Sequence, residues 1–374
     1  MYERYCNMWD VDLEQFWKDD EIAHKDNCFF KGNQVALGIR MSDECVFAEL
    51  GEEGTPWAPI PRERRLELNK RYNDKAEKLV GRRLLRETLP DPRSEFPYVK
   101  RIGEVFGGQY IYENDTEWLT QSVNTPEELE ALLDRVDKLD IREFMLPANW
   151  ESEKKRIYEE FGTKPDVMRH IRGPVTLACS IFGSENLIFL GIDEPELYER
   201  FSRTIAEVTL KMAAVMDEEA GVTAKSRPGF SFADDNCCLL TPDLYRRFGY
   251  PVLKALFDKY SPNPNDPRYQ HSDSAMAHLL PILGELDLTG VNFGPTVMVP
   301  EIRKYLPHAR IDGCIAPFTF MRNDVDGLKM EVNRDVDYGF EYGGVNITTA
   351  GSINNGSSLD SMRLVMSIIQ SKRR

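Results

Sequence analysis

The sequence has no run of about 18 consecutive apolar residues, the length that a membrane-spanning helix needs. Its first ten residues lack the basic and then apolar order of a secretory signal peptide. It contains no low-complexity tract and no repeat of fixed period. Its seven cysteines, an odd number at irregular spacing, do not indicate a disulfide framework. We therefore expect a cytoplasmic protein with reduced thiols.

Basic residues are scarce relative to acidic ones. The chain of 374 residues has 47 Lys and Arg against 62 Asp and Glu, a formal net charge of −15. Such a chain has no general electrostatic attraction to nucleic acid or to an anionic membrane. Hydrophobic residues make up 41% of it and aromatic residues 10%, enough for a large core. These values predict a globular protein and do not favour nucleic acid or an anionic membrane as its partner.

Short β-prone runs alternate with longer helical patterns along the chain. The eight predicted strands are 35–41, 109–113, 175–182, 229–233, 268–270, 290–293, 310–315 and 344–348. Each is followed by a helix-like segment, which predicts parallel βαβ units and, for eight of them, a (β/α)8 TIM barrel with extra N-terminal helices. We expect one domain over residues 1–374. Residues 1–34 would pack on the barrel as an extension, and residues 115–165 would form a helical insertion.

Polar side chains follow most of the predicted strands. Parallel barrels carry their chemistry on the loops after the strands' carboxyl ends, so these residues are candidates for an active site. Arg40, which follows the first strand, suits contact with a carboxylate or phosphate, and an ion pair with Asp43 or Glu44 is the alternative. The candidates for substrate binding are Arg40, Ser180, Asn292 and Asn354.

His271 and Asp273 stand two residues apart, so both side chains point the same way on a continuing strand. Cys314 follows two strands later and could face them across a barrel. Imidazole, carboxylate and thiolate together make a workable Zn²⁺ set. Without metal, His271 and Asp273 could hold a substrate or transfer protons. A purely structural role is the third interpretation.

Asp234 and Asp235 are adjacent, so on a strand they face opposite ways and only one can enter the mouth of a barrel. A carboxylate there could bind a cation, orient a ring nitrogen or act as a base. One of the two could equally cap the following helix. We count both as catalytic candidates, together with His271 and Asp273.

At these residues the chain resembles the uroporphyrinogen decarboxylase superfamily. That group of (β/α)8 barrels also includes corrinoid-linked, zinc-dependent methyltransferases that act on coenzyme M. The resemblance covers residues from about 170 to the C-terminus. It rests on Gly-Pro-Val-Thr-Leu at 173–177, Phe-Ala-Asp-Asp at 232–235, His-x-Asp at 271–273, Asp-Gly-Cys-Ile-Ala-Pro at 312–317 and Ala-Gly-Ser-Ile at 350–353.

The chain departs from both branches of this group. The decarboxylases' arginine-rich segment is reduced to Arg40, their catalytic tyrosine falls on Ser180 and their last-strand histidine on Gly351. The methyltransferases hold zinc with His-x-Cys and a distant cysteine. Here those cysteines fall on Asp273 and Gly351, and Cys314 is a candidate substitute. Carboxylate in place of thiolate makes a metal site harder.

The resemblance implies an enzyme that transfers a methyl group to or from a small, oxygen-rich substrate. Its cofactors would be zinc and a corrinoid carried on a partner protein. A decarboxylase or other lyase is the alternative enzyme, and a non-catalytic small-molecule binder on a degenerate barrel is the alternative outside enzymes. The partners left open are a corrinoid protein and a second copy of the chain in a homodimer, whereas nucleic acid and membrane are not expected.

Overall fold

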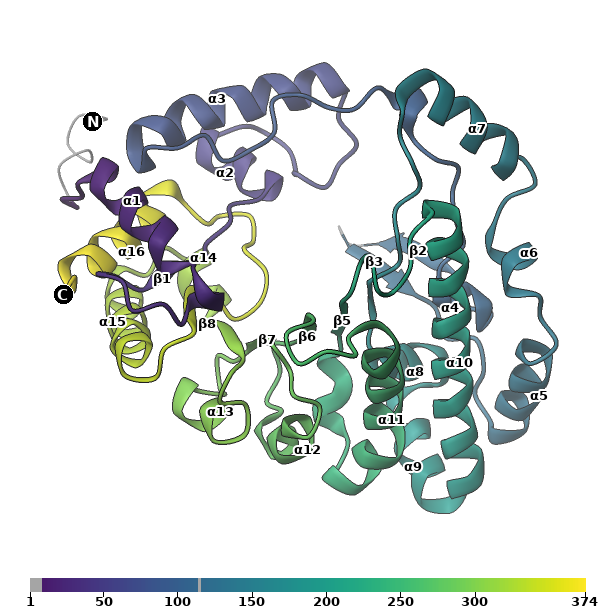
Figure 1. The fold of residues 1–374 in the computed structure, drawn as a ribbon. Coiled ribbons are helices and arrows are strands. Elements are labelled where there is room, and N and C mark those ends of the chain that lie inside the picture. The colour runs from purple at the N-terminus through teal and green to yellow at the C-terminus, as the bar shows by residue number, and fades with distance from the viewer. Residues whose placement is uncertain (1–8, 114–115) are drawn as a thin grey trace. The chain divides into compact units, whose positions relative to one another are not determined.

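The computed structural model describes residues 9–113 and 116–374. Residues 1–8, in the predicted extension, and residue 115, the first of the predicted insertion, lie outside the described residues. The chain forms two compact units. Unit 1 comprises residues 1–89, 273–277 and 290–374, and unit 2 comprises residues 90–272 and 278–289. Figure 1 labels most of their helices and strands.

Unit 1 contains four parallel strands in the order β1-β9-β8-β7. They are β1 (Ala36–Leu37), β7 (Gly290–Phe293), β8 (Arg310–Ile315) and β9 (Val345–Thr349). All four lie within or next to predicted strands. The helices of this unit are α1 (Leu13–Ala23), α2 (Val46–Leu50), α3 (Arg62–Val80), α13 (Val299–Tyr305), α14 (Pro317–Met321), α15 (Val325–Tyr342) and α16 (Leu359–Ser371).

Unit 2 contains three parallel strands in the order β6-β5-β4 and a separate antiparallel pair, β2-β3. The strands are β2 (Tyr110–Glu113), β3 (Thr116–Leu119), β4 (His170–Arg172), β5 (Phe230–Ala233) and β6 (Arg268–Ser272). The helices are α4 (Ile102–Val105), α5 (Pro126–Val136), α6 (Ile141–Met145), α7 (Trp150–Phe161), α8 (Pro174–Phe182), α9 (Ser184–Asp193), α10 (Pro195–Ala220), α11 (Pro242–Tyr260) and α12 (Leu280–Gly284).

Two predicted strands are wrong. Residues 109–113 form one arm of the antiparallel pair rather than a parallel strand. Residues 175–182 form helix α8, because Pro174 occupies its first turn and the carboxylate of Asp234 accepts a hydrogen bond from the Thr176 N–H. A short apolar run fits a strand or a buried helix equally well. The parallel strand of this region is instead β4, at residues 170–172.

Capping residues mark the ends of the long helices. Thr241 caps α11 by accepting from the Leu244 N–H, and Gly221 ends α10 in a left-handed conformation with φ of 67°. The apolar stripe of α10, which includes Phe201, Ile205 and Met212, is buried. Residues 115–165 contain the helices α5 and α7, with the short α6 between them.

No single helix in the described part of the chain is long and apolar enough to cross a membrane. The pair α8 and α9 reaches the required length and composition only when taken together, with a bend of 101° between its members. All but one of the residues of α8 are buried within the protein, as in a core helix.

Candidate active site

The candidate site is built on the carboxyl end of β6. Within this strand Gln270 and Ser272 are buried, and the Ser272 hydroxyl donates to the carbonyl of Asp234. Because side chains alternate along a strand, His271 projects from the opposite face. Asp273, the first residue after the strand, follows two positions later. The sequence therefore places an imidazole and a carboxylate side by side, as predicted.

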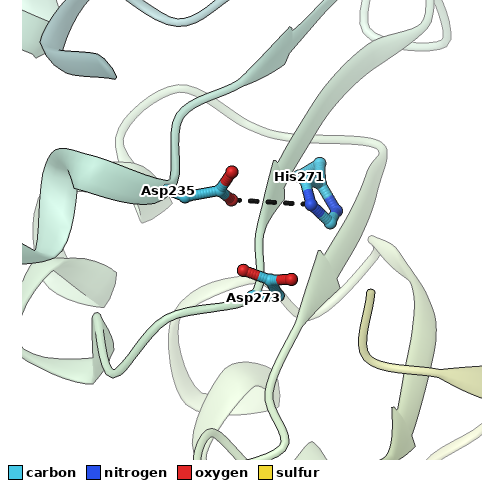
Figure 2. A group of neighbouring side chains, drawn as sticks. All are labelled: Asp235, His271 and Asp273. Carbon is cyan, nitrogen blue, oxygen red and sulfur yellow. Dashed lines mark ion pairs between the residues drawn. The ribbon is translucent and has the colours of Figure 1, made fainter. Parts of the chain in front are cut away.

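A third side chain completes the group. Asp235, at the start of a 3₁₀ turn (Asp235–Leu239) after β5, places Oδ1 3.5 Å from Nε2 of His271. Figure 2 shows the side chains of Asp235 and His271 facing each other, joined by the dashed line of their ion pair, with the carboxylate of Asp273 beside them. One ligand atom from each of the three residues lies within 4.8 Å of the others. His271 and Asp235 are partly accessible, with side-chain exposures of 24% and 41%.

Asp234, the neighbour of Asp235, has a different role. Its side chain is fully buried, Oδ1 accepts from the Thr176 N–H at 2.8 Å, and Oδ2 has no hydrogen-bond partner among the described residues. Burial raises the pKa of Asp234 to about 7, against the hydrogen bonds from Thr176 that lower it. Asp234 thus caps α8, and Asp235 is the member of the pair that meets His271.

Two polar residues close to His271 and Ser180 were not among the predicted candidates, because strand β4 was not predicted. His170 and Arg172 lie on this strand, and the register pairs them with Ser231 and Ala233 of β5. His170 Nδ1 lies 2.8 Å from the Ser231 hydroxyl. Burial lowers the pKa of His170, and the nearby His271 lowers it further. Strand β4 has the sequence His-Ile-Arg, in which a single apolar residue gives no hydrophobic pattern. The positions of His170 and Arg172 therefore become clear only from the strand register.

Ser180, predicted to bind substrate, lies on α8 and accepts a hydrogen bond from Nη1 of Arg172 at 3.2 Å. The remaining predicted binding residues lie in unit 1. Asn292 is buried on β7, where its amide donates to the carbonyls of Asp312 and Thr349. Asn354 lies in the loop after β9, and Arg40 is exposed after β1.

Cys314 does not belong to the group of potential ligands found among the described residues. It lies on β8 with its side chain fully buried, and its thiol donates to the carbonyl of Val297 at 3.7 Å. Burial raises the pKa of this thiol far above its ordinary value, which disfavours the thiolate that metal binding needs. Asp235, and not Cys314, is the third member of the group whose side chains could hold a metal ion.

Comparison with known proteins identifies the family. The model of the family described as "Uroporphyrinogen decarboxylase (URO-D)" matches residues 96–370. The chain belongs to the URO-D family. No curated protein sequence matches it significantly. Among solved structures, it is similar to a methyltransferase from Methanosarcina mazei, with a TM-score of 0.56 and 17% sequence identity over 97% of this chain and 99% of the other.

Membership of the URO-D family and the likeness to the methyltransferase confirm the predicted α/β fold class, the (β/α)8 barrel. In the described residues, seven parallel strands represent it, four in unit 1 and three in unit 2. At 17% identity the likeness concerns the fold alone. The chemistry of this URO-D family member has to be argued from its own residues.

Proposed function

We propose that this URO-D family member is an enzyme that transfers a methyl group to or from a small, oxygen-rich substrate at a divalent metal ion. Asp235, His271 and Asp273 would hold the ion. The observation that carries the proposal is the convergence of these three side chains on one point at the carboxyl end of β6. The methyltransferase with the same fold supports the reaction class.

The donor set fits a zinc-like ion. Two ligands that lie about 2 Å from a shared ion are at most about 4 Å apart, so small side-chain rotations suffice to close the observed group. The bound ion would supply Lewis acidity to an atom of the substrate. Because two of the three ligands are carboxylates, the site is harder than a thiolate site and suits an oxygen atom rather than a sulfur atom.

The protein's own groups position the ligands. Before an ion binds, the Asp235 carboxylate can orient the His271 ring, since Oδ1 lies 3.5 Å from Nε2. The 3₁₀ turn that carries Asp235 is held by the hydrogen bond from the Asn236 N–H to Oγ1 of Thr176, at 3.0 Å. Without an ion, the same imidazole and carboxylate could move a proton, which is what the alternative lyase function would require.

We propose in addition that the methyl group is exchanged with a corrinoid carried on a separate protein. This part of the proposal rests on the family resemblance of the motifs at residues 173–177, 232–235 and 271–273. It predicts that the purified chain forms a complex with a corrinoid protein and alters its visible absorption spectrum when substrate is added, with the methylated corrinoid if the substrate accepts the methyl group and with the reduced, unmethylated corrinoid if the substrate donates it. An unchanged spectrum with a substrate that the enzyme demonstrably binds would remove the corrinoid from the proposal.

Titration of chelator-treated protein with Zn²⁺ tests the metal site directly. We expect one ion per chain, with affinity reduced by at least about tenfold in Asp235→Asn, His271→Ala and Asp273→Asn. His308→Ala is the matched control, because His308 is an exposed histidine outside the group. Equal affinity in all four variants would refute the metal site. A loss of Zn²⁺ affinity in His271→Ala alone would show that Asp235 and Asp273 lie near the ion without binding it.

A further inference from the structure

The three strands β4, β5 and β6 have one packed face and one accessible face. Ile171, Phe230, Phe232, Gln270 and Ser272 are buried on the packed face. The alternate residues, which point the other way, are all partly or fully exposed: His170, Arg172, Ser231, Ala233, Tyr269 and His271. Parallel strands ordinarily bury apolar side chains on both faces. An accessible face made almost entirely of polar side chains therefore indicates a binding surface.

The register orders these side chains in two rows. Arg172 pairs with Ala233, and Ala233 pairs with His271, so the three side chains lie level with one another on neighbouring strands. Strands in a sheet lie about 4.8 Å apart, which puts the Cα atoms of Arg172 and His271 about 10 Å from each other. Ala233 between them has only a methyl group. In the other row, which lies two residues earlier along each strand, the side chains of His170 and Ser231 are hydrogen-bonded to each other.

Arg172 is held in place but keeps most of its donors. A guanidinium has five N–H donors, and within the described part of the chain Arg172 makes one hydrogen bond, from Nη1 to the Ser180 hydroxyl. Ser180 in turn donates to the carbonyl of Thr176, so helix α8 fixes its position. Among the described residues, no carboxylate lies within ion-pair distance of Arg172. This contrasts with Arg156 and Arg246 of the same unit, which are paired with glutamates.

We propose that Arg172 and Ser180 bind a carboxylate of the substrate, and that the substrate lies over Ala233 with its reacting end at His271 and Asp235. The planar guanidinium can hold a carboxylate by two parallel hydrogen bonds. The separation of the two ends limits the substrate to a short acid with a few carbon atoms. This inference rests on the proposed function for the identity of the reacting end, but the anion site itself stands without the metal.

The net charge of the protein makes a local cation important for binding an acid. With a net charge of −15, the chain has no general attraction for anions, so a nearby guanidinium such as that of Arg172 would favour their binding. His170 is poorly suited to that task, because burial and the proximity of His271 lower its pKa and favour the neutral imidazole. Arg172 is the cation on this face whose charge does not titrate.

Calorimetric titration with methoxyacetate, succinate, inorganic phosphate and the neutral methoxyacetamide tests the proposal. We expect the wild-type protein to bind methoxyacetate or succinate and not the amide. Arg172→Gln should weaken binding of the acid by about 10- to 100-fold, because charge-assisted hydrogen bonds contribute strongly to affinity. Arg172→Lys should weaken it by less, because lysine keeps the charge but cannot form two parallel hydrogen bonds with a carboxylate. Ser180→Ala should weaken it a few-fold. The matched control is Arg227→Gln, an exposed arginine of unit 2.

The outcomes separate this proposal from the metal site. Binding of the acids that survives in His271→Ala, while Zn²⁺ binding is lost, supports the anion site independently of the proposed function. Arg172→Gln should leave Zn²⁺ affinity unchanged, which also shows that the variant is folded. The proposal is overturned if neither acid binds the wild type, if the amide binds as well as the acid, if phosphate binds more tightly than both acids, or if Arg172→Gln binds acid like Arg227→Gln.

Discussion

Glu219, near the end of α10, provides the sharpest test of how unit 2 is held together. Its side chain is 1% exposed, and its carboxylate accepts hydrogen bonds from Trp150 Nε1 at 2.7 Å, from Lys154 and from Arg142. Trp150 and Lys154 belong to α7, and Arg142 belongs to α6. One buried carboxylate therefore joins the inserted helices to the long helix α10.

The change that tests this arrangement is Glu219→Gln, which keeps the size of the side chain and removes its charge. Breaking a buried ion pair from one side costs about 3–5 kcal/mol of unfolding free energy. Arg142 and Lys154 are partly exposed and keep Glu151 as a partner, so we expect a loss near the lower end, about 3 kcal/mol. Glu218→Gln is the matched control. Glu218 pairs with the same Arg142 but is 74% exposed, and its loss should cost less than about 0.5 kcal/mol.

The pH dependence gives a second, independent readout. Burial alone would raise the pKa of Glu219, but the hydrogen bonds from Lys154, Trp150 and Arg142 outweigh it and hold the pKa below its ordinary value. A lowered pKa in the folded protein stabilises the fold above the pKa of the unfolded chain, and this contribution disappears as the pH falls through the folded value. The difference between wild type and Glu219→Gln should therefore be full at pH 7 and shrink below about pH 4.

Urea denaturation at several pH values measures both effects, with an unchanged m-value as the check that the transition stays comparable. If Glu219→Gln and Glu218→Gln have the same unfolding free energy at pH 7, the buried network does not stabilise unit 2. A difference between wild type and Glu219→Gln that grows on acidification would contradict the assigned sign of the pKa shift.

Two further predictions concern the start of α8. A Cβ atom at Gly173 would lie 2.2 Å from Cβ of Asp234, so Gly173→Ala should cost about 1–3 kcal/mol in urea denaturation, whereas Gly32→Ala, where the nearest atom is 3.4 Å away, should cost much less. Equal costs would refute the close approach. Thr176→Val removes the acceptor of the Asn236 N–H and should cost about 1–2 kcal/mol, while Thr176→Ser retains the acceptor and most of the stability; if serine is as damaging as valine, the hydroxyl is not the stabilising group.

Most of the fold could be predicted because local patterns and tertiary contacts agree. Strands β5, β7 and β8 are short and continuous, and each of the three lies next to glycine or proline residues that mark a turn in the sequence. Strand β4 could not be found, since its three residues are His-Ile-Arg and carry no apolar pattern. The error at residues 175–182 has a related cause. Its helical start depends on Asp234, 58 residues further along the chain, and no local signal reports that contact.

The candidate site was predictable where it depends on strand periodicity. The spacing of two residues places His271 and Asp273 together whatever the surroundings. The choice between Asp234 and Asp235 depends on where β5 ends and the 3₁₀ turn begins, which adjacent acidic residues cannot reveal. Strand periodicity did not predict the surroundings of Cys314. This residue also stands two positions after an aspartate, Asp312, but its thiol packs against the Val297 carbonyl. Its position in a barrel layer does not decide which contacts such a small side chain makes.

Thr176 links the two ends of the site that we propose. Its N–H donates to Asp234, its hydroxyl accepts from the Asn236 N–H, and its carbonyl accepts from the hydroxyl of Ser180. The first two contacts hold the turn that carries Asp235, and the third holds the partner of Arg172. Because one residue of α8 joins both, the spacing between the anion site and Asp235 is set by hydrogen bonds within unit 2. A substrate that matches this spacing would be selected by length as well as by charge.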